Sequence, residues 1–382
     1  MKNKTRLMLG LLASLTLPAL ADISALVAIE PTARKDGYLI SRNALEAGLA
    51  KALAEDVAVT STEDLSDAMR STRSAGFDIF IGPAQVVASA LGHGYELIGS
   101  TDPEENYMLV GRAGVTGVAG LRGGRLYLPQ QDSIYTYMAR GVLTAAGLSF
   151  KDLQGVNYAR YPQAGLTAIA IRSADATMVR RDDWELWQKD NPGVASVLAT
   201  SGAVPGGFSA AVRRTLPAAQ REALAKWFGA AVRGTGLKPM TQHAAPERYK
   251  AVAALGTFTP GSLPGATLVT ADDVRRLMAQ GALLVDTRIE SEYRDRHITG
   301  ARWVPYQEKS LKDVAYDATL DNFSGVKALN PKTPTIFQCN GPECWKSYKA
   351  CRTAIGLGFS KVYWYRGGMP DWEAAGLPTS RE

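Results

Sequence analysis

Short apolar segments alternate with amphipathic segments along most of this chain, and that alternation restricts its possible folds more than any other feature. Residues 24–29, 57–59 and 77–81 have the apolar composition of buried strands. Residues 43–54, between the first two of these, place leucines at the spacing of one helical face. A strand–helix–strand–helix order predicts a mostly parallel sheet covered by helices on both faces, which is an α/β fold.

The same alternation continues to about residue 255. Thr62 is expected to cap the helix after the second strand, because a threonine hydroxyl can accept a hydrogen bond from the first helical turn. The periodicity of residues 167–171 fits a helix and a strand equally well. Further strands are predicted at residues 107–111, 125–128 and 174–179, and further helices at residues 135–146 and 213–232.

A segment rich in proline and glycine, residues 257–265, ends this pattern. Such a segment marks a domain boundary, and a chain of 382 residues is long enough for two or three hydrophobic cores. We therefore predict one domain over residues 22–255, a linker over residues 256–267 and a second α/β domain over residues 268–382.

The N-terminal segment has the three parts of a secretory signal. Three basic residues precede an apolar run, residues 7–17, and Ala19-Leu20-Ala21 supplies the small residues at which such signals are cleaved. The apolar run is too short to span a membrane comfortably. We therefore predict a signal peptide over residues 1–21 and an exported protein, which would be periplasmic in a Gram-negative bacterium.

Composition and charge narrow the classes of partner. The formal net charge is +6, and half of it lies in residues 1–21, which contain three basic residues and no acidic ones. No dense tract of lysine and arginine with interleaved aromatic residues occurs, so we expect no nucleic-acid partner. With 46% apolar and 21% charged residues, the composition is that of a globular protein.

The chain has three cysteines, and all of them lie between residues 339 and 351. Cys339 follows a predicted strand at residues 335–338, and a short loop then leads to a predicted helix at residues 346–357. Backbone N–H groups converge where a loop feeds a helix, and they stabilise a thiolate or an anion. An odd number of cysteines in an oxidising compartment leaves at least one unpaired, so the sequence predicts a reactive thiol at Cys339.

Several short patches of the first domain resemble the type II periplasmic substrate-binding proteins, in particular the branch associated with phosphonate and sulfonate uptake. These patches are residues 29–31, 77–84, 120–127 and 207–212. In that family two α/β lobes close over a ligand. The resemblance therefore implies a two-lobed domain and a small oxyanion or sulfur compound as its ligand.

The same resemblance implies candidate ligand-binding residues, because the family holds oxyanions with hydroxyls and backbone amides at helix N-termini. Asp132 lies in the relevant polar turn and would repel an anion if it faced the cleft, so helix capping is the alternative role for this turn. Tyr135 and Tyr137 could line the cleft or pack an interface. The candidates are Gln130, Gln131, Ser133 and Thr136, with Pro31, Thr32, Gly82 and Pro83 from the other lobe.

The second domain resembles rhodanese domains, which are sulfurtransferases with a parallel α/β sheet. The matching segments are residues 285–301, Cys339 after its strand, and residues 358–372, which contain Gly367-Gly368-Met369. The resemblance implies that Cys339 is the catalytic cysteine and cycles through a persulfide. A small sulfur donor would supply the sulfur, and cyanide or a thiol, including a protein thiol, would accept it.

The loop after Cys339 departs from the commonest pattern of that family, in which an arginine often closes the loop. Here Glu343 adds a negative charge and Lys346 is the first cation, so thiosulfate should bind less well. Gly341 permits a positive φ that the curl of the loop could need. The predicted active-site loop comprises Asn340, Gly341, Pro342, Glu343, Cys344, Trp345 and Lys346.

Several of these residues have two interpretations. Cys344 could resolve the persulfide by forming a disulfide with Cys339, or it could pack against the sheet, which is slightly favoured. Cys351 fits a small buried residue. Asp286 and Arg288 could border the active site or pair with each other. We expect a hydrogen-bonding role for His297, a core position for Trp372, and for Arg366 either an exposed position or the steering of an anionic donor.

These features favour an exported sulfurtransferase fused to a domain for a small ligand. The alternatives are a non-catalytic solute-binding or sensor protein, and a thiol–disulfide protein that uses Cys339 and Cys344. No cofactor is expected. The cysteine spacing fits no common zinc site, and no histidine or fourth ligand lies near these residues, so no metal is expected either.

Overall fold

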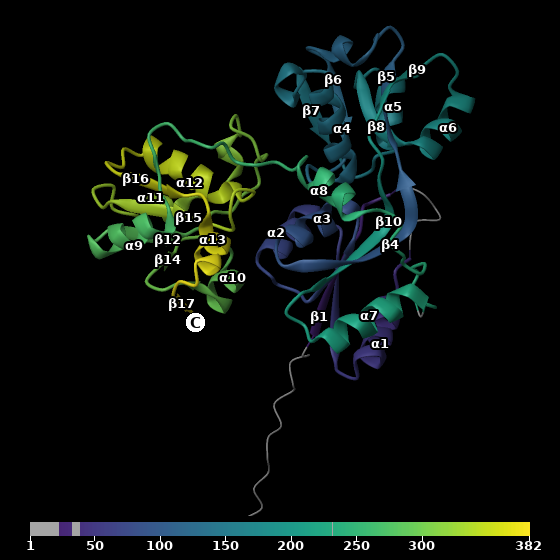
Figure 1. Cartoon of the computed structure of the whole chain (residues 1–382). Coiled ribbons are helices and arrows are strands. Elements are labelled where there is room, and N and C mark those ends of the chain that lie inside the picture. The colour runs from purple at the N-terminus through teal and green to yellow at the C-terminus, as the bar shows by residue number, and fades with distance from the viewer. Residues whose placement is uncertain (1–22, 33–38, 231) are drawn as a thin grey trace, which may run out of the picture.

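The computed structural model describes residues 23–32, 39–230 and 232–382. The predicted signal peptide therefore lies outside the described residues. The chain forms three α/β units, which we call lobe 1, lobe 2 and the C-terminal domain (Figure 1). Within the described ranges, no helix is both long enough and apolar enough to cross a membrane.

Lobe 1 contains a five-stranded sheet in the order β2-β1-β3-β10-β4. The first three strands are parallel, as the sequence predicts, but β10 is antiparallel to both of its neighbours. Alternate residues of each strand face two separate helical layers, so the sheet is buried on both sides. The strands are β1 (Ile23–Ala28), β2 (Val57–Thr62), β3 (Ile79–Gly82), β4 (Tyr95–Glu105) and β10 (Val204–Arg213). Helices α1 (Arg42–Leu53) and α7 (Ala218–Ala230) cover one face, and α2 (Leu65–Arg73), α3 (Ala84–Gly92) and α8 (Pro246–Ala253) cover the other.

Lobe 2 has a second five-stranded sheet in the order β7-β6-β8-β5-β9. It is also mixed, because β5 is antiparallel to β8 and β9 while β6 is parallel to β7 and β8. The ambiguous segment at residues 167–171 belongs largely to helix α5. The elements are β5 (Tyr107–Arg112), β6 (Arg125–Leu128), β7 (Gly155–Tyr158), β8 (Ala176–Arg180), β9 (Ala195–Thr200), α4 (Ile134–Ala145), α5 (Ala164–Ala170) and α6 (Arg181–Asp190).

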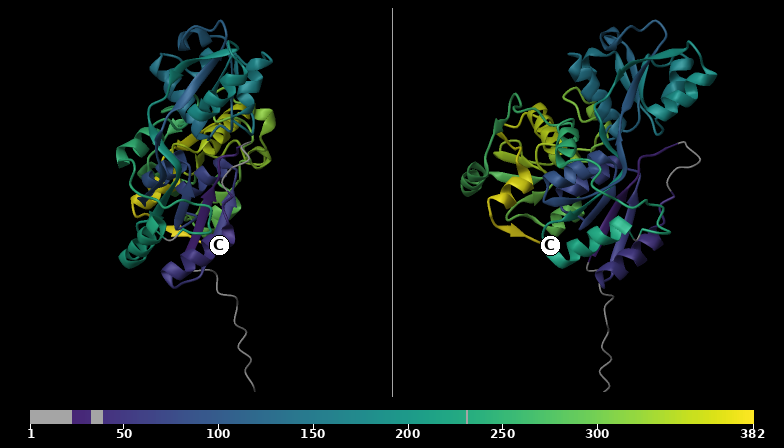
Figure 2. Two further views of the ribbon diagram at one scale, coloured as in Figure 1. Left: turned by 90° about the vertical axis from the view of Figure 1, so that its right-hand side faces the viewer. Right: turned by 45° about the vertical axis from the view of Figure 1, so that its right-hand side comes forward.

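The chain crosses between the lobes at two places. Only Asn106 separates β4 from β5, and residues 201–203 separate β9 from β10. The side-chain amide nitrogen of Asn106 donates to the carbonyl oxygen of Ser201 over 2.9 Å, so a hydrogen bond joins the two crossings. Figure 2 shows the two lobes stacked on either side of these crossings.

The C-terminal domain has a five-stranded sheet in the order β11-β16-β15-β12-β14, and every pair of strands in it is parallel. The expected α/β fold with a parallel sheet is confirmed here. The strands are β11 (Thr267–Leu268), β12 (Leu283–Asp286), β14 (Arg302–Trp303), β15 (Thr335–Gln338) and β16 (Val362–Tyr365). Helices α11 (Ser324–Lys327) and α12 (Trp345–Gly356) cover one face, and α9 (Ala271–Ala279), α10 (Glu290–Asp295) and α13 (Gly368–Ala374) cover the other, while β13 (His297–Ile298) and β17 (Thr379–Ser380) form a separate pair.

Two predicted helix starts are wrong. Asp64, and not Thr62, caps α2: its side chain accepts from the backbone N–H of Asp67, while Thr62 still belongs to β2. The helix predicted to begin at residue 213 begins at Ala218, because Arg213 is the last residue of β10 and pairs with β4. In both cases strand pairing extends past the point where local helix signals begin.

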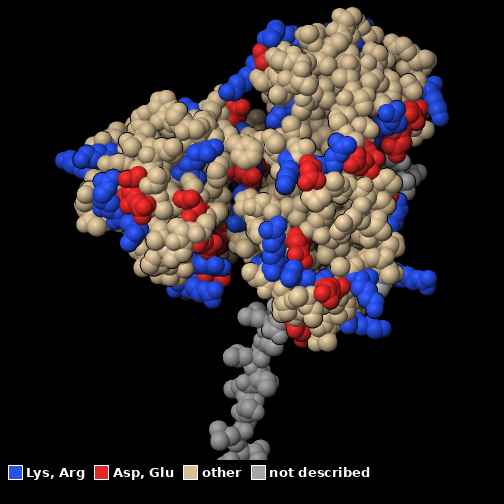
Figure 3. Space-filling model, viewed as in Figure 1, with Lys and Arg blue, Asp and Glu red and all other residues tan. Residues whose placement is uncertain are grey.

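The C-terminal domain lies beside lobe 1, as both figures of the ribbon show (Figures 1 and 2). The linker packs against the C-terminal domain: the indole N–H of Trp345 donates to the carbonyl of Thr257, and Thr259 donates from its backbone and hydroxyl to the carbonyl of Pro342. On the face seen in Figure 3, acidic and basic side chains of the described residues are interspersed, including near the junction of these two units.

Candidate functional site

The cysteine loop, residues 339–344, connects the end of a central strand to the start of a long helix. Strand β15 ends at Gln338, and Cys344 is the N-cap residue of α12, so both ends of the loop are fixed by regular structure. Cys339 and Cys344 form a disulfide with their Cα atoms 6.1 Å apart. The packing role favoured for Cys344 is therefore wrong, and the disulfide interpretation agrees with the structure.

Glycines shape the loop and the helix that supports it. Gly341 has a φ of 83°, in the region that favours glycine, as predicted. The backbone N–H of Met369 donates to the carbonyl of Cys339 over 2.9 Å. A Cβ atom on Gly368 would collide with that carbonyl. A glycine at position 368 is thus needed to bring α13 against the loop.

The cysteine loop borders a cavity of about 500 Å³ between the C-terminal domain and the two lobes, which we call the interdomain cavity. Helix α2 of lobe 1 reaches the loop directly: the Arg73 guanidinium donates to the Glu343 carboxylate over 3.0 Å. Its neighbour Arg70 donates to the Glu292 carboxylate over 2.8 Å. The first domain therefore covers the cysteine loop with two arginines.

Charged groups of both signs surround the interdomain cavity. Burial lowers the pKa of Lys346, and the positive charges of Arg70 and Arg73 lower it further, whereas Glu292 and Glu308 oppose that shift. The cavity is lined by Asp64, Ser66, Asp67, Arg70, Arg73, Gln130, Gln131, Tyr158, Arg288, Glu292, Glu308, Lys309, Lys312, Cys339, Glu343, Cys344 and Lys346, among others. Arginines and lysines from both domains thus lie around the disulfide, although the cysteine loop itself contains no cation and Lys346 belongs to the first turn of α12.

Two buried acceptors at this cavity have no hydrogen-bond partner among the described residues. They are Asn340 Oδ1 and Glu292 Oε2. In the same two side chains, Asn340 Nδ2 donates to Glu292 Oε1 over 3.1 Å. Unpaired buried acceptors are costly, so a bound molecule that donates hydrogen bonds would be favoured here.

The structure separates the two interpretations of several predicted residues. Asp286 and Arg288 form a buried ion pair over 2.7 Å, and of the two only Arg288 lines the interdomain cavity. His297 Nδ1 lies 2.8 Å from the carbonyl oxygen of Tyr293, which is a structural contact. Arg366 donates to Thr259 of the linker over 2.7 Å, outside the interdomain cavity. Trp372 is buried, as expected.

Sequence reasoning missed the contribution of lobe 1 to this site. Arg73 and Glu343 are 270 positions apart, and Arg70 and Glu292 are 222 apart. Nothing in the local pattern of α2 distinguishes these arginines from the exposed ones of an amphipathic helix. Only the docking of the two domains brings them together.

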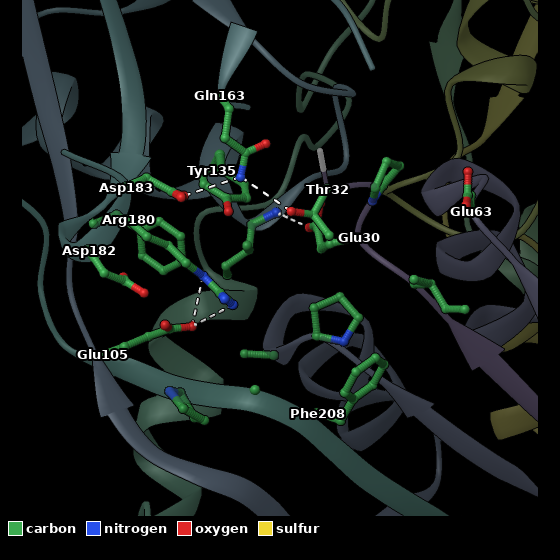
Figure 4. A pocket seen from close by; sticks show the side chains of 18 of the residues that line it. Glu30, Thr32, Glu63, Glu105, Tyr135, Gln163, Arg180, Asp182, Asp183 and Phe208 are labelled. Atoms are coloured by element: carbon green, nitrogen blue, oxygen red, sulfur yellow. Dashed lines mark hydrogen bonds and ion pairs between the residues drawn. The ribbon is translucent and has the colours of Figure 1, made fainter. Parts of the chain in front are cut away.

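A second cavity, of about 480 Å³, lies between the two lobes, and we call it the cleft (Figure 4). Pro31, Thr32 and Pro83 line it, as the resemblance implied. Its described lining is rich in acids and aromatic rings and comprises Ile29, Glu30, Pro31, Thr32, Glu63, Pro83, Ala84, Glu105, Tyr107, Ile134, Tyr135, Gln163, Arg180, Asp182, Asp183, Pro205, Gly207, Phe208 and Lys238.

Glu30, two residues after the end of β1, reaches the N-terminus of α4 in the cleft (Figure 4). Its carboxylate accepts from the backbone N–H of Ile134 over 2.7 Å, the hydroxyl of Ser133 over 3.0 Å and the amide of Gln85 over 2.9 Å. Burial raises the pKa of Glu30, while these hydrogen bonds act in the opposite direction. Sequence analysis did not single out this residue.

On the opposite side of the cleft, Arg180 donates to Glu105 over 3.2 Å. The ring of Tyr135 packs edge-on against Tyr107, and burial raises the pKa of both phenols. Tyr135 therefore lines the cleft, whereas Tyr137 is buried outside its lining.

The four polar candidates of the turn before α4 do not line the cleft. The amide of Gln130 bonds Glu63 and Leu65, and Gln131 accepts from the backbone N–H of Lys312 over 3.0 Å, so both face the interdomain cavity. Ser133 caps α4 and holds Glu30. Thr136 is fully buried and donates to the carbonyl of Gln130.

Asp132 points away from the cleft. Its carboxylate is paired with the Lys312 ammonium of the C-terminal domain and accepts from the Ser66 hydroxyl over 2.6 Å. Burial would raise the pKa of Asp132, but the interaction with Lys312 and the hydrogen bonds lower it overall. The expected repulsion of a ligand by this residue therefore does not arise.

Comparison with known families covers most of the chain. Residues 27–252, more than half of the chain, match the family model described as ABC transporter, phosphonate, periplasmic substrate-binding protein. Residues 270–375 match the model of the rhodanese-like domain. No curated protein sequence matches.

Three solved structures are similar to parts of this chain. PhnD1 from Prochlorococcus marinus, in complex with methylphosphonate, is 16% identical, with a TM-score of 0.47, covering 61% of this chain and 97% of its own. XAC2383 from Xanthomonas citri, bound to ATP, is 13% identical with a TM-score of 0.48. The match covers 60% of this chain and 95% of XAC2383. BH2092 protein from Bacillus halodurans is 23% identical with a TM-score of 0.25. The match covers 30% of this chain and 77% of BH2092.

The family matches agree with the two folds described above. The two-lobed domain is of the solute-binding type, and the parallel-sheet domain that carries Cys339 is rhodanese-like. The chain therefore belongs to the phosphonate-type periplasmic substrate-binding proteins of ABC transporters and carries a rhodanese-like domain at its C-terminal end.

Proposed function

We propose that this protein is an exported sulfurtransferase in which Cys339 carries a sulfane sulfur as a persulfide. The observation that carries the proposal is the position of Cys339: it directly follows β15, borders the interdomain cavity, and is joined by a disulfide to the N-cap residue of α12. A helix N-terminus and nearby cations favour a thiolate and an anionic persulfide.

The chemistry begins from the reduced pair of cysteines. The Cys339 thiolate attacks the outer sulfur of a donor such as thiosulfate, sulfite leaves with the electron pair of the broken S–S bond, and a persulfide anion remains. Cyanide can then take the outer sulfur, which yields thiocyanate and restores the thiolate. Each step conserves sulfur and charge and needs no further reactant.

Cys344 offers a second way to discharge the persulfide. Its thiolate attacks the inner sulfur of the protonated persulfide, hydrosulfide leaves, and the Cys339–Cys344 disulfide forms. The two cysteines are oxidised and the transferred sulfur is reduced to sulfide. An external dithiol must then reduce the disulfide before the next cycle.

The surroundings of the cysteines support a small donor. Cys339 and Cys344 are both buried, and the covering helix α2 is held by the Arg73–Glu343 and Arg70–Glu292 pairs. A cavity of about 500 Å³ has room for thiosulfate, a polysulfide or a small thiol. A protein thiol as partner would require the domains to separate.

The two-lobed domain would bind a separate small solute in its cleft. The cleft of about 480 Å³ between two lobes joined by two crossings supports this role. Export by a signal peptide that is cleaved before Asp22 would deliver both activities to the periplasm, the compartment of the family to which the chain belongs.

A thiol–disulfide role is the second candidate, and the disulfide between Cys339 and Cys344 favours it. The pair could exchange electrons with another dithiol without carrying sulfur. The two candidates differ in one product, because only the sulfurtransferase releases thiocyanate from thiosulfate and cyanide.

The test is an assay of thiocyanate release on protein that has been reduced and freed of reductant. Cys339→Ser should release thiocyanate at least about 100-fold more slowly than the wild type, because the nucleophile is absent. Cys351→Ala is the matched control and should retain it, because Cys351 is buried in α12 away from the cavity. Activity that survives in Cys339→Ser would exclude the proposal. Disulfide exchange without any sulfur transfer in the wild type would favour the second candidate.

A further inference from the structure

The N-terminus of α4 is the place in the cleft where an anion would be expected. A helix N-terminus presents unpaired N–H groups and a positive dipole end, and both attract anions. Helix α4 has 12 residues, its N-cap is Ser133, and Ile134 lines the cleft. In this chain those donors already hold an anion, which is the side chain of Glu30.

The contacts of Glu30 use both carboxylate oxygens. The backbone N–H of Ile134 and the amide of Gln85 donate to Oε1 over 2.7 and 2.9 Å, and the Ser133 hydroxyl donates to Oε2 over 3.0 Å. This is the arrangement that a free oxyanion would need. Glu30 comes from lobe 1 while α4 belongs to lobe 2, so the contact also joins the lobes (Figure 4).

Gln85 shows that the site is built around this carboxylate. Its side chain is fully buried on α3, and its amide N–H₂ is divided between Glu30 and the carbonyl of Asp132. Its Oε1 is buried without a partner among the described residues. A buried oxygen without a hydrogen bond costs stability. The amide is therefore placed here for its two N–H donors, which hold Glu30 and the turn before α4.

Electrostatics oppose a second anion beside Glu30. Two like charges that lie close together in a partly buried cleft repel each other, because little water screens them. Arg180, a cationic residue that lines the cleft, is already paired with Glu105 over 3.2 Å. A free phosphonate or sulfonate would therefore have to displace Glu30 or bind next to it without those donors.

We infer that Glu30 determines the specificity of the cleft by acting as a built-in anion at the N-terminus of α4. The cleft rejects a free tetrahedral oxyanion at that position and takes a solute that presents an ammonium or guanidinium group to Glu30. This inference deepens the solute-binding part of the proposed function and does not depend on the chemistry of Cys339.

The test is calorimetry on the full exported chain with methylphosphonate as the probe. The wild type should show no saturable binding. Glu30→Ala frees the donors of Ser133, Ile134 and Gln85 and should bind methylphosphonate at least about 100-fold more tightly, which is about 2.7 kcal/mol. Glu63→Ala is the matched control, because Glu63 also lines the cleft but does not contact α4. It should remain a non-binder.

The cation assignment is tested on the same proteins with putrescine, agmatine and ethanolamine. At least one should bind the wild type, and Glu30→Gln, which keeps the shape but removes the charge, should weaken that binding at least about tenfold. Thermal unfolding of each variant checks that it is folded.

Three results would overturn the inference. They are saturable binding of methylphosphonate by the wild type, an equal gain in Glu30→Ala and Glu63→Ala, and no binding of any amine. The first needs no variant, so it stands even if Glu30→Ala fails to fold. If no probe binds either the wild type or folded Glu30→Ala, the solute-binding part of the proposed function fails as well. The sulfur-transfer part is tested separately by the thiocyanate assay.

Discussion

Cys339 and Cys351 show how the environment of a side chain decides its chemistry. Cys339 directly follows β15 and borders a cavity lined by Arg70 and Arg73. Cys351 lies one helix further on, fully buried in the core, and burial raises the pKa of its thiol well above the ordinary value. The sequence distinguishes the two because a strand-end position and a mid-helix position are both local features.

Thiol labelling should therefore divide the three cysteines. In the folded protein after reduction, an alkylating reagent is expected to modify Cys339 and Cys344, because both border the interdomain cavity. Cys351 should stay unmodified, because it lies in the core away from that cavity and a buried neutral thiol reacts slowly. Peptide mass spectrometry locates the label, and unfolding in guanidinium should expose the third site. Rapid labelling of Cys351 in the native protein would contradict the packing described for α12.

Other residues could not be assigned from the sequence. For residues 130–136 the sequence leaves two roles open, ligand binding and helix capping, and in the structure their side chains serve the capping of α4, the lobe contact and the domain contact. Glu30 was overlooked, because an acid after a strand carries no local sign of the helix that it will meet. Its role depends on a contact between residues 104 positions apart.

At the scale of elements, the strands and helices were largely predictable and their pairing was not. The predicted spans of β6 and β15 agree with the structure residue for residue. The antiparallel placement of β10 was not foreseen, because it depends on the chain's path through lobe 2 and back. Local periodicity indicates that a segment is a strand but not which neighbour it meets.

Asp175 joins several elements of lobe 2 and gives a prediction about pH. Burial alone would raise its pKa, but hydrogen bonds from Arg125 and Arg112 outweigh burial and lower the pKa from 3.8 to about 2. A carboxyl group with a lowered pKa in the folded state stabilises it at high pH, and that stabilisation is lost as the pH falls from 3.8 to about 2.

Asp175→Asn should therefore lower the free energy of unfolding at pH 7 by about 1–2 kcal/mol, after allowance for solvent screening of the two exposed arginines. Urea unfolding of variant and wild type should show that this difference shrinks as the pH approaches 2. Asp190→Asn, at the exposed end of α6, is the control and should have little effect. A difference that stays constant with pH would contradict the ion-pair explanation.

At the scale of the whole molecule, one turn connects the two cavities. Ser133 and Ile134 hold Glu30 at the cleft, while Gln131 and Asp132 contact Lys312 of the C-terminal domain. The C-terminal domain thus touches lobe 2 through Lys312 and lobe 1 through Arg70 and Arg73. The turn therefore contacts the cleft on one side and the C-terminal domain on the other.

The covering of the cysteine loop predicts a size limit for reductants. Dithiothreitol should reduce the Cys339–Cys344 disulfide readily, while thioredoxin should be slow because α2 blocks its approach. The double variant Arg73→Ala, Lys312→Ala removes two contacts that hold the domains together. The rate at which thioredoxin reduces the disulfide, divided by the rate with dithiothreitol, should be at least about tenfold higher in this variant than in the wild type. A tenfold change corresponds to about 1.4 kcal/mol of docking free energy.

Arg42→Ala is the control for this experiment, because Arg42 pairs only with Glu46 on the surface of α1 among the described contacts. It should leave both rates unchanged. Equal rates with the two reductants in the wild type would show that the domains already separate in solution, and the covered arrangement would then not govern access to Cys339.

The central claim is that Cys339 accepts a sulfane sulfur, and intact-mass spectrometry tests it most directly. Reduced Cys344→Ser, which cannot close the disulfide, is incubated with thiosulfate or a polysulfide and compared with Cys339→Ser. We expect Cys344→Ser to gain the mass of one sulfur atom, which peptide mapping should locate on Cys339. Cys339→Ser should gain none. No gained sulfur in Cys344→Ser, or an equal gain in both variants, would contradict it.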